Sequence, residues 1–169
     1  MTVLFALLKA VNVGGTGKMP MSDLKVLCEE AGLETVRTYI ASGNVMFTTS
    51  RTPKAAKALI EARILDRFGK QVPVFIRTLP ELKKVAEANP FKARPSNRVL
   101  VHFLDTSPPP DVSKDARHLA GEEVAAGTRE VYVYYPDGQG QSKLVLPATR
   151  EGTARNINTV TRLIDLAGI

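Results

Sequence analysis

The pattern of apolar positions predicts a strand and a helix at the beginning of the chain. Residues 2–11 are apolar at both alternating sets of positions, which is typical of a central strand covered on both faces. From Pro20 or Met21 the apolar residues recur at helical spacing up to Ala31, and Gly32 follows as a left-handed C-cap. The apolar stripe of this helix consists of Leu24, Leu27, Cys28 and Ala31.

A hairpin, a second helix and a fourth strand are predicted next. The β-branched and aromatic residues at 35–40 and 45–49 flank the turn-like segment Ala41–Asn44. A helix then begins at Pro53, where proline is favoured in the first turn, and ends near Phe68 before a strand over residues 72–78. The resulting order, β-α-β-β-α-β, is that of the ferredoxin-like plait.

The second half of the chain starts a similar order but does not complete it. We expect a strand over residues 98–104, a short helix over 111–119, a hairpin formed by 122–126 and 130–135, and a final helix over 158–167. No obvious last strand is visible. The sequence therefore predicts an α+β protein of two ferredoxin-like (βαββαβ) halves, of which the second is degenerate. The turn-like residues 93–97 mark the boundary, which gives domains 1–90 and 91–169.

Two polar loops are expected at one edge of the first sheet. They follow the first and second predicted strands, which run in the same direction in this topology, and the turn near Gly69 ends at the same edge. Glycine lets backbone amides approach a ligand closely, and a following helix N-terminus favours an anion. The candidate ligand-binding residues here are Asn12, Gly14, Gly15, Lys18, Ser42, Gly43 and Asn44.

The same residues have a simpler interpretation, in which the glycines only supply left-handed backbone positions in turns. The loop before Lys18 lacks the glycine spacing of a Walker loop, and Met19 stands where that motif has Ser or Thr. The pattern is also not a dinucleotide-binding fingerprint. The sequence thus leaves a binding role and a structural role open for these loops.

Two polar segments of the second half allow similar alternatives. Gly138–Lys143 superficially resembles a phosphate loop, but its Ser and Lys stand in the wrong order, which favours a flexible, solvated turn. Before the last helix, Asn158 or Thr159 is the expected N-cap. The alternative is that Arg155 and Asn156 join a polar ligand-binding site with Lys143.

The charge balance favours an anionic partner. The chain has 23 basic and 17 acidic residues, and residues 1–90 hold 13 of the basic and 8 of the acidic ones. Such an excess is compatible with a phosphorylated small molecule or with nucleic acid. On the predicted helix 53–68 the basic residues are interleaved with acidic ones, which is typical of a solvated face. An RNA-binding plait presents paired aromatic side chains on its central strands, and Phe5 and Phe47 match this pattern only weakly.

Catalytic, metal and membrane signatures are not apparent. His102 and His118 are far apart and have no Cys or carboxylate at ligand spacing, and no Ser-His-Asp order can be argued. We therefore expect no metal and no cofactor, and assign no reaction.

No apolar run approaches the roughly 20 residues that span a bilayer. The single cysteine, Cys28, lies on a helical apolar stripe, so we expect a core residue and a reducing cytoplasm.

Five segments resemble a bacterial family catalogued as domain of unknown function 1697. The resemblance spans essentially the whole chain. It implies two ferredoxin-like α/β halves in a cytoplasmic bacterial protein, and it implies no established activity. The segments are Leu7–Gly15 (LLKAVNVGG), Thr38–Val45 (TYIASGNV), Asn89–Phe91 (NPF), Tyr135–Leu144 (YPDGQGQSKL) and Arg155–Val160 (RNINTV).

The chain departs from the family pattern at three places. The family usually has Arg-Gly-Ile at residues 9–11, Gln at Ala41 and Trp at Ile157. The missing aromatic at Ile157 weakens any stacking role there. Three hypotheses about function follow: binding of an anionic or phosphorylated small molecule at the Asn12/Ser42 edge, nucleic-acid binding by the basic first half, and a structural or protein-interaction module.

Overall fold

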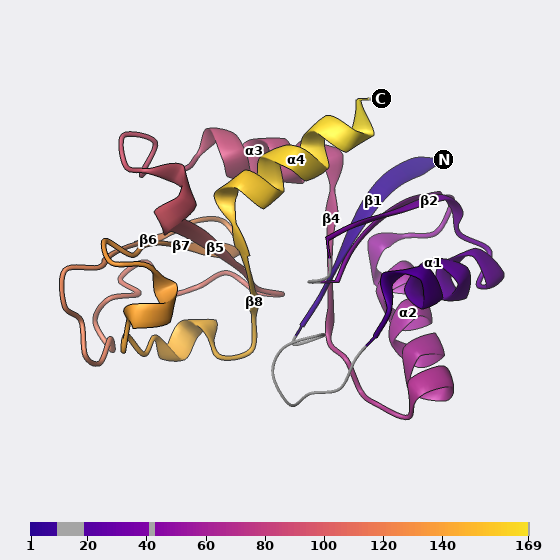
Figure 1. Cartoon of the computed structure of the whole chain (residues 1–169), viewed down its shortest axis with the longest axis horizontal. Helices are drawn as coiled ribbons and strands as arrows, with labels where there is room; N and C mark the ends of the chain where they lie inside the picture. The colour runs from indigo at the N-terminus through magenta and orange to yellow at the C-terminus, as the bar shows by residue number, and fades with distance from the viewer. Residues whose placement is uncertain (10–18, 41–42, 169) are drawn as a thin grey trace. The chain divides into compact units, whose positions relative to one another are not determined.

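The computed structural model describes residues 1–9, 19–40 and 43–168 (Figure 1). The chain divides into two compact units. The first unit consists of Met1–Glu81 and Leu166–Ile169, and the second unit consists of Leu82–Asp165. The described residues form two four-stranded antiparallel sheets and four α-helices, so the predicted α+β class is confirmed.

The first unit contains the six elements in the predicted order. Its sheet has the strand order β2-β3-β1-β4, and every neighbouring pair is antiparallel. Of the predicted strand over residues 2–11, the structure shows Thr2–Leu8 as a strand, and residues 10 and 11 lie outside the described residues. The elements are β1 (Thr2–Leu8), α1 (Met21–Glu30), β2 (Glu34–Tyr39), β3 (Asn44–Thr49), α2 (Pro53–Phe68) and β4 (Val74–Thr78).

Local signals in the sequence begin and end α2 where the pattern predicts. The Thr52 hydroxyl accepts a hydrogen bond from the Ala55 N–H at 3.1 Å, and Pro53 occupies the first turn. At the other end, Gly69 adopts a left-handed conformation with φ of 67°, and its N–H donates to the Leu65 carbonyl. A residue with a Cβ is strained in this conformation, so glycine is the natural stop.

The core of the first unit lies between α1, α2 and one face of the sheet (Figure 1). Leu4 and Leu8 of β1 point to this face and pack with residues such as Phe47 and Ile60. Phe5 and Leu7, which point to the other face, are also fully buried. The prediction that this central strand is buried on both faces is therefore confirmed.

Side chains satisfy the backbone along the outer side of β4, which is an edge strand of the first sheet. Because Lys9 N–H donates to the Pro73 carbonyl, the next pair, Leu8 and Val74, is a non-hydrogen-bonded pair. The polar groups of Val74 consequently point away from β1. Glu61 of α2 accepts the Val74 N–H at 2.9 Å, and Lys57 donates to the Val74 carbonyl. Two residues further along β4, the Arg77 guanidinium donates to the Ile76 carbonyl at 3.0 Å.

Replacing Glu61 by alanine is expected to lower the free energy of unfolding by about 1–2 kcal/mol, because the Val74 N–H loses a charge-assisted acceptor at a partly exposed site. The carboxylate also forms an ion pair with Lys57 at 3.1 Å. Urea denaturation measures the loss. Glu61→Gln keeps an amide oxygen as acceptor and should lose less, while Asp66→Ala on the exposed side of α2 should change little. Equal losses in all three variants would contradict this account.

The second unit contains a sheet with the corresponding strand order, β6-β7-β5-β8, again antiparallel throughout. The predicted hairpin around Gly127 is confirmed by the pairing of β6 with β7. The Tyr132 hydroxyl donates to the Val85 carbonyl at 2.8 Å, which attaches α3 to this sheet. The remaining elements are α3 (Leu79–Glu87), β5 (Val99–Phe103), β6 (Glu123–Ala126), β7 (Glu130–Tyr134), β8 (Thr153–Asn156) and α4 (Ile157–Ala167). The start of α3 and the end of α4 belong to the first unit.

The predicted helix over residues 111–119 is wrong. This segment forms turns, and Arg117 exchanges two backbone hydrogen bonds of 2.9 Å with Val145. The next residue, His118, has a positive φ of 59°, which an α-helix does not allow. Pairing with a distant segment has therefore overridden a weak local preference.

The expectation that the second half lacks a last strand is also wrong, because β8 pairs with β5. The predicted N-cap of the final helix, Asn158 or Thr159, is wrong as well. Asn156 precedes the first helical residue, and its side-chain oxygen accepts the Asn158 N–H at 2.8 Å. Asn156, rather than Asn158 or Thr159, therefore caps α4. Its amide also donates to the Asn97 carbonyl at 3.1 Å.

Candidate functional site

The predicted meeting of strand ends at one edge of the first sheet is confirmed for the described residues. Leu7 of β1 is paired with Asn44, the first residue of β3. The Leu8 N–H donates to the Gly43 carbonyl at 2.9 Å, and the Lys9 N–H donates to the Pro73 carbonyl at 3.0 Å. The end of β1, the turn before β3 and the residues that lead into β4 thus share this edge.

The candidate residues at this edge divide into two sets. Asn12, Gly14, Gly15, Lys18 and Ser42 lie outside the described residues. Gly43 and Asn44 are described, and both shape the turn. Gly43 has a φ of 83°, which glycine adopts without strain. Asn44 is fully buried, and its amide donates to the Tyr39 carbonyl at 2.9 Å.

The candidate residues of the second unit lie in two different places. Arg155 is buried on β8, where its guanidinium donates to the Thr153 hydroxyl and the Ala154 carbonyl, each at 2.8 Å. Burial lowers the pKa of Arg155 to about 10. Arg155 and Asn156 do not line the pocket to which Lys143 belongs, so the structure does not join these three in that pocket.

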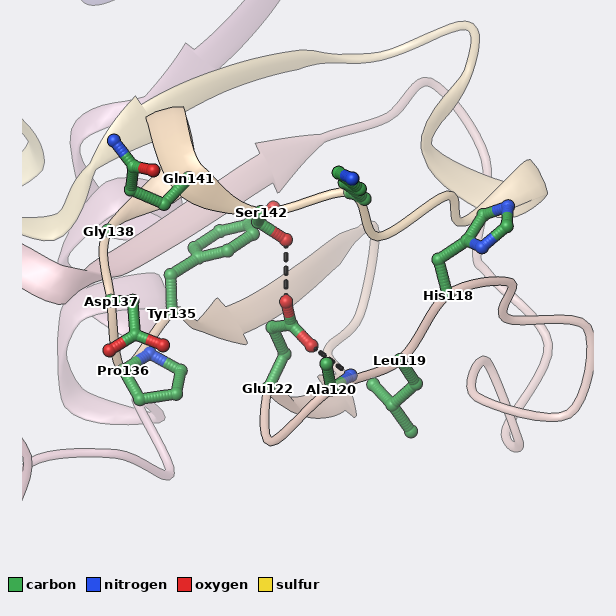
Figure 2. Close-up of a pocket in the computed structure, with 11 residues that line it drawn as sticks. His118, Leu119, Ala120, Glu122, Tyr135, Pro136, Asp137, Gly138, Gln141 and Ser142 are labelled. Carbon is green, nitrogen blue, oxygen red and sulfur yellow. Dashed lines mark hydrogen bonds between the residues drawn. The ribbon is translucent and has the colours of Figure 1, made fainter.

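That pocket lies wholly in the second unit and has a volume of about 340 Å³ (Figure 2). Three stretches form it: the loop that leads into β6, the residue after β7, and the loop of residues 136–143. We refer to it as the Glu122 pocket. Its lining residues are His118, Leu119, Ala120, Glu122, Tyr135, Pro136, Asp137, Gly138, Gln141, Ser142 and Lys143.

The carboxylate of Glu122 is held by a donor at each oxygen. The Ser142 hydroxyl donates to one oxygen, and the Ala120 N–H donates to the other, each at 2.6 Å (Figure 2). The bond from Ser142, followed by the bond from Ala120, holds the pKa of Glu122 below its usual range. The group is therefore an ionised, oriented acceptor at neutral pH.

Tyr135, which also lines the pocket, has its hydroxyl oxygen 3.4 Å from the Nε2 atom of His102. Burial lowers the pKa of His102 to about 4. Burial, with a smaller contribution from the charge of Glu122, raises the pKa of Tyr135 to about 12. Both side chains are consequently neutral at pH 7.

The loop of residues 138–143 is a turn, as the sequence favours, rather than a phosphate loop. Three of its backbone N–H groups donate within the turn. The Gly138 N–H donates to the Tyr135 carbonyl at 3.0 Å, the Gln141 N–H to the Gly138 carbonyl at 3.2 Å and the Ser142 N–H to the Gln139 carbonyl at 3.1 Å. A phosphate loop instead directs such amides at its ligand.

Lys143 is the one lining residue that the sequence predicted to bind a ligand, in a site with Arg155 and Asn156, whereas Glu122 and Tyr135 were not predicted. Glu122 and Ser142 are separated by 20 residues, and His102 and Tyr135 are separated by 33. Contacts between residues so far apart along the chain produce no periodic pattern in the sequence from which they could be predicted. Among the described residues, no helix is long and apolar enough to cross a membrane.

The fold and these sites define a class of α+β protein with two four-stranded antiparallel sheets of corresponding strand order. A conserved bacterial protein of Streptococcus pneumoniae has a similar structure, with a TM-score of 0.77 and 21% sequence identity over 98% of each chain. At this identity the similarity shows a shared fold.

The model of a family of proteins of unknown function, DUF1697, matches residues 1–132, so the chain belongs to this family. The predicted family is therefore confirmed, and the matched range includes the segments Leu7–Gly15, Thr38–Val45 and Asn89–Phe91. Comparison with curated proteins gave no match.

Proposed function

We propose that this protein binds a small anionic or phosphorylated molecule at the edge of the first sheet where β1 ends and β3 begins. The observation that carries the proposal is the hydrogen bond from Leu8 N–H to the Gly43 carbonyl. It places Leu8, the last residue of β1, beside Gly43, which precedes β3. In the sequence, residues 10–18 follow β1 and residues 41–43 precede β3. These are the two segments whose sequences contain the polar and glycine candidates.

Charge and residue type support an anion as the ligand. Most of the basic excess of the chain belongs to its first half, where 13 basic residues stand against 8 acidic ones. Lys18 and Asn12 are residue types that donate hydrogen bonds to phosphate or carboxylate oxygens, and Gly14 and Gly15 permit close approach of backbone amides. The role of each of these residues is part of the proposal.

We also propose that the first unit is a ferredoxin-like plait, that the second unit is a degenerate copy of it, and that the protein is cytoplasmic. The strand order β2-β3-β1-β4 and the element order of the first unit support a ferredoxin-like plait, and the second unit supports a degenerate copy. The one cysteine, Cys28, is buried and unpaired, which supports a reducing cytoplasmic setting.

Isothermal titration calorimetry with inorganic phosphate and with adenosine triphosphate tests the proposed binding. Lys18→Ala should weaken binding about tenfold or more, because one charge-assisted hydrogen bond is worth roughly 1.5–3 kcal/mol. Lys54→Ala, which removes the same charge from an exposed position on α2, is the matched control. Absence of heat with millimolar ligand, or equal affinities of the two variants, would count against the proposal. A steep salt dependence of oligonucleotide binding would favour the nucleic-acid alternative instead.

A further inference from the structure

The Glu122 pocket consists of residues of the second unit, whereas the edge to which we assign anion binding belongs to the first unit. Its volume of about 340 Å³ is at the lower end of the range found for small-molecule sites, which is about 300–1,000 Å³. The pocket also combines apolar walls with a few polar groups. Leu119, Pro136 and the ring of Tyr135 supply the apolar part.

The central polar group of the pocket accepts hydrogen bonds and carries a negative charge. Ser142 and Ala120 occupy one acceptor position on each oxygen of Glu122. A carboxylate has about four such positions, so further donors can still bind. In the part of the chain that the structure describes, no basic side chain forms an ion pair with Glu122.

A second carboxylate, that of Asp137, belongs to the same pocket, and Figure 2 shows it beside Pro136. The Tyr135 phenol, which also lines the pocket, is neutral, and its oxygen has lone pairs that accept hydrogen bonds. The acceptors that line the pocket therefore match a ligand that brings hydrogen-bond donors and positive charge.

Two other ligand classes fit this pocket poorly. An anion would face Glu122 and Asp137, and the backbone donors of Gly138, Gln141 and Ser142 are already used within the turn. A metal ion would need more ligands, because the described residues contain no group of three or more His, Cys, Asp or Glu side chains placed to hold one.

We propose that the Glu122 pocket binds a small organic cation, namely a primary amine with an apolar body. Its ammonium group donates hydrogen bonds to the Glu122 carboxylate, and its apolar part packs against Leu119, Pro136 and Tyr135. Lys143 and His118 also line the pocket, so its surface is not uniformly acidic. The position of the ammonium group relative to Glu122, rather than overall charge, therefore selects the ligand.

Titration of the ¹⁵N-labelled protein with benzylamine at pH 7, followed by NMR, tests this assignment. Benzyl alcohol is the matched control ligand, because it replaces the ammonium by a hydroxyl on the same ring. We expect saturable shifts of the backbone amides of Ala120, Glu122 and Ser142 with benzylamine, in the millimolar range. Benzyl alcohol should bind at least about tenfold more weakly, which corresponds to one lost charge-assisted hydrogen bond.

Two variants separate the role of the carboxylate from general effects of charge. Glu122→Gln keeps the side-chain shape and should lose the preference for benzylamine over benzyl alcohol. Glu123→Gln changes the neighbouring residue, which forms an ion pair with Arg94 and does not line the pocket, and should bind as the unchanged protein does. The spectra themselves report whether each variant is folded.

Three outcomes would overturn the proposal, and each is visible in the same experiment. One is equal binding of the alcohol and the amine to the unchanged protein, which does not depend on any variant. Another is an unchanged preference for the amine in Glu122→Gln. The third is tighter binding of calcium chloride than of benzylamine at the same amides, which would identify a cation site for metal instead.

Discussion

Replacing Gly152 by alanine is expected to destabilise the protein by about 2–3 kcal/mol, the upper part of the range for overpacking a buried position. Gly152 is buried directly before β8. A Cβ atom there would lie 2.5 Å from the Phe103 carbonyl oxygen and 2.6 Å from the Leu104 side chain. Because the nearest atom belongs to the backbone, relief requires β8 to move away from β5.

A matched substitution elsewhere isolates this steric effect. Gly140→Ala makes the same chemical change, but a Cβ atom at Gly140 would meet no atom within 4 Å. We expect this variant to unfold within about 0.5 kcal/mol of the unchanged protein, as is usual for surface substitutions. Thermal and urea denaturation compare the two. Equal stabilities would show that the space beside Phe103 relaxes without cost.

Acidification from pH 6.5 to pH 4 is expected to remove about 2–3 kcal/mol of stability through His102, whose pKa falls from 6.5 to about 4 on burial. In this interval the unfolded chain takes up a proton that the folded protein binds less readily. The unfolded state therefore gains relative stability as the pH falls. The contribution of His102 is fully present above pH 6.5 and is lost as the pH decreases toward 4.

Carboxylates also titrate in this interval, so the contribution of His102 is measured by difference. His102→Gln removes the titrating ring, keeps a polar group near Tyr135, and should flatten the acid side of the stability profile. His118→Gln, at an exposed position, should leave the profile unchanged. Urea denaturation at several pH values gives these profiles. Parallel profiles for His102→Gln and the unchanged protein would refute the assignment.

The first unit was predictable from the sequence because several local signals agree there. The apolar period of α2, its proline start and its glycine end all indicate the same helix. The strand preferences on both sides of Gly43 likewise predict the hairpin of β2 and β3. Right-handed crossovers then place the end of β1 beside that hairpin, as the structure confirms.

The second unit was harder to predict because its elements are short and depend on distant partners. The strand β8 has four residues, of which Thr153, Arg155 and Asn156 are polar, and it forms by pairing with β5. Within residues 111–119, the predicted helix is replaced by turns and by the backbone pairing of Arg117 with Val145. Local propensity is weak evidence where such pairing decides the structure.

Of the two candidate sites, one was predictable from the sequence and the other was not. The edge at Gly43 was predictable because strand direction is a property of the topology. The Glu122 pocket was not, because its oriented carboxylate results from a contact between Glu122 and Ser142, 20 residues apart. Among its lining residues only Lys143 was a predicted ligand-binding residue, and it was grouped with Arg155 and Asn156, which do not line the pocket.

The side chains that cover the outer backbone of β4 have a consequence for how molecules of this protein behave when concentrated. An exposed sheet edge is a template on which a strand of another molecule can add, and this is a common route to aggregation. At β4, Lys57 and Glu61 occupy both polar groups of Val74, and Arg77 occupies the Ile76 carbonyl. An incoming strand would have to displace these charged groups before it could pair, so this edge resists growth into larger assemblies.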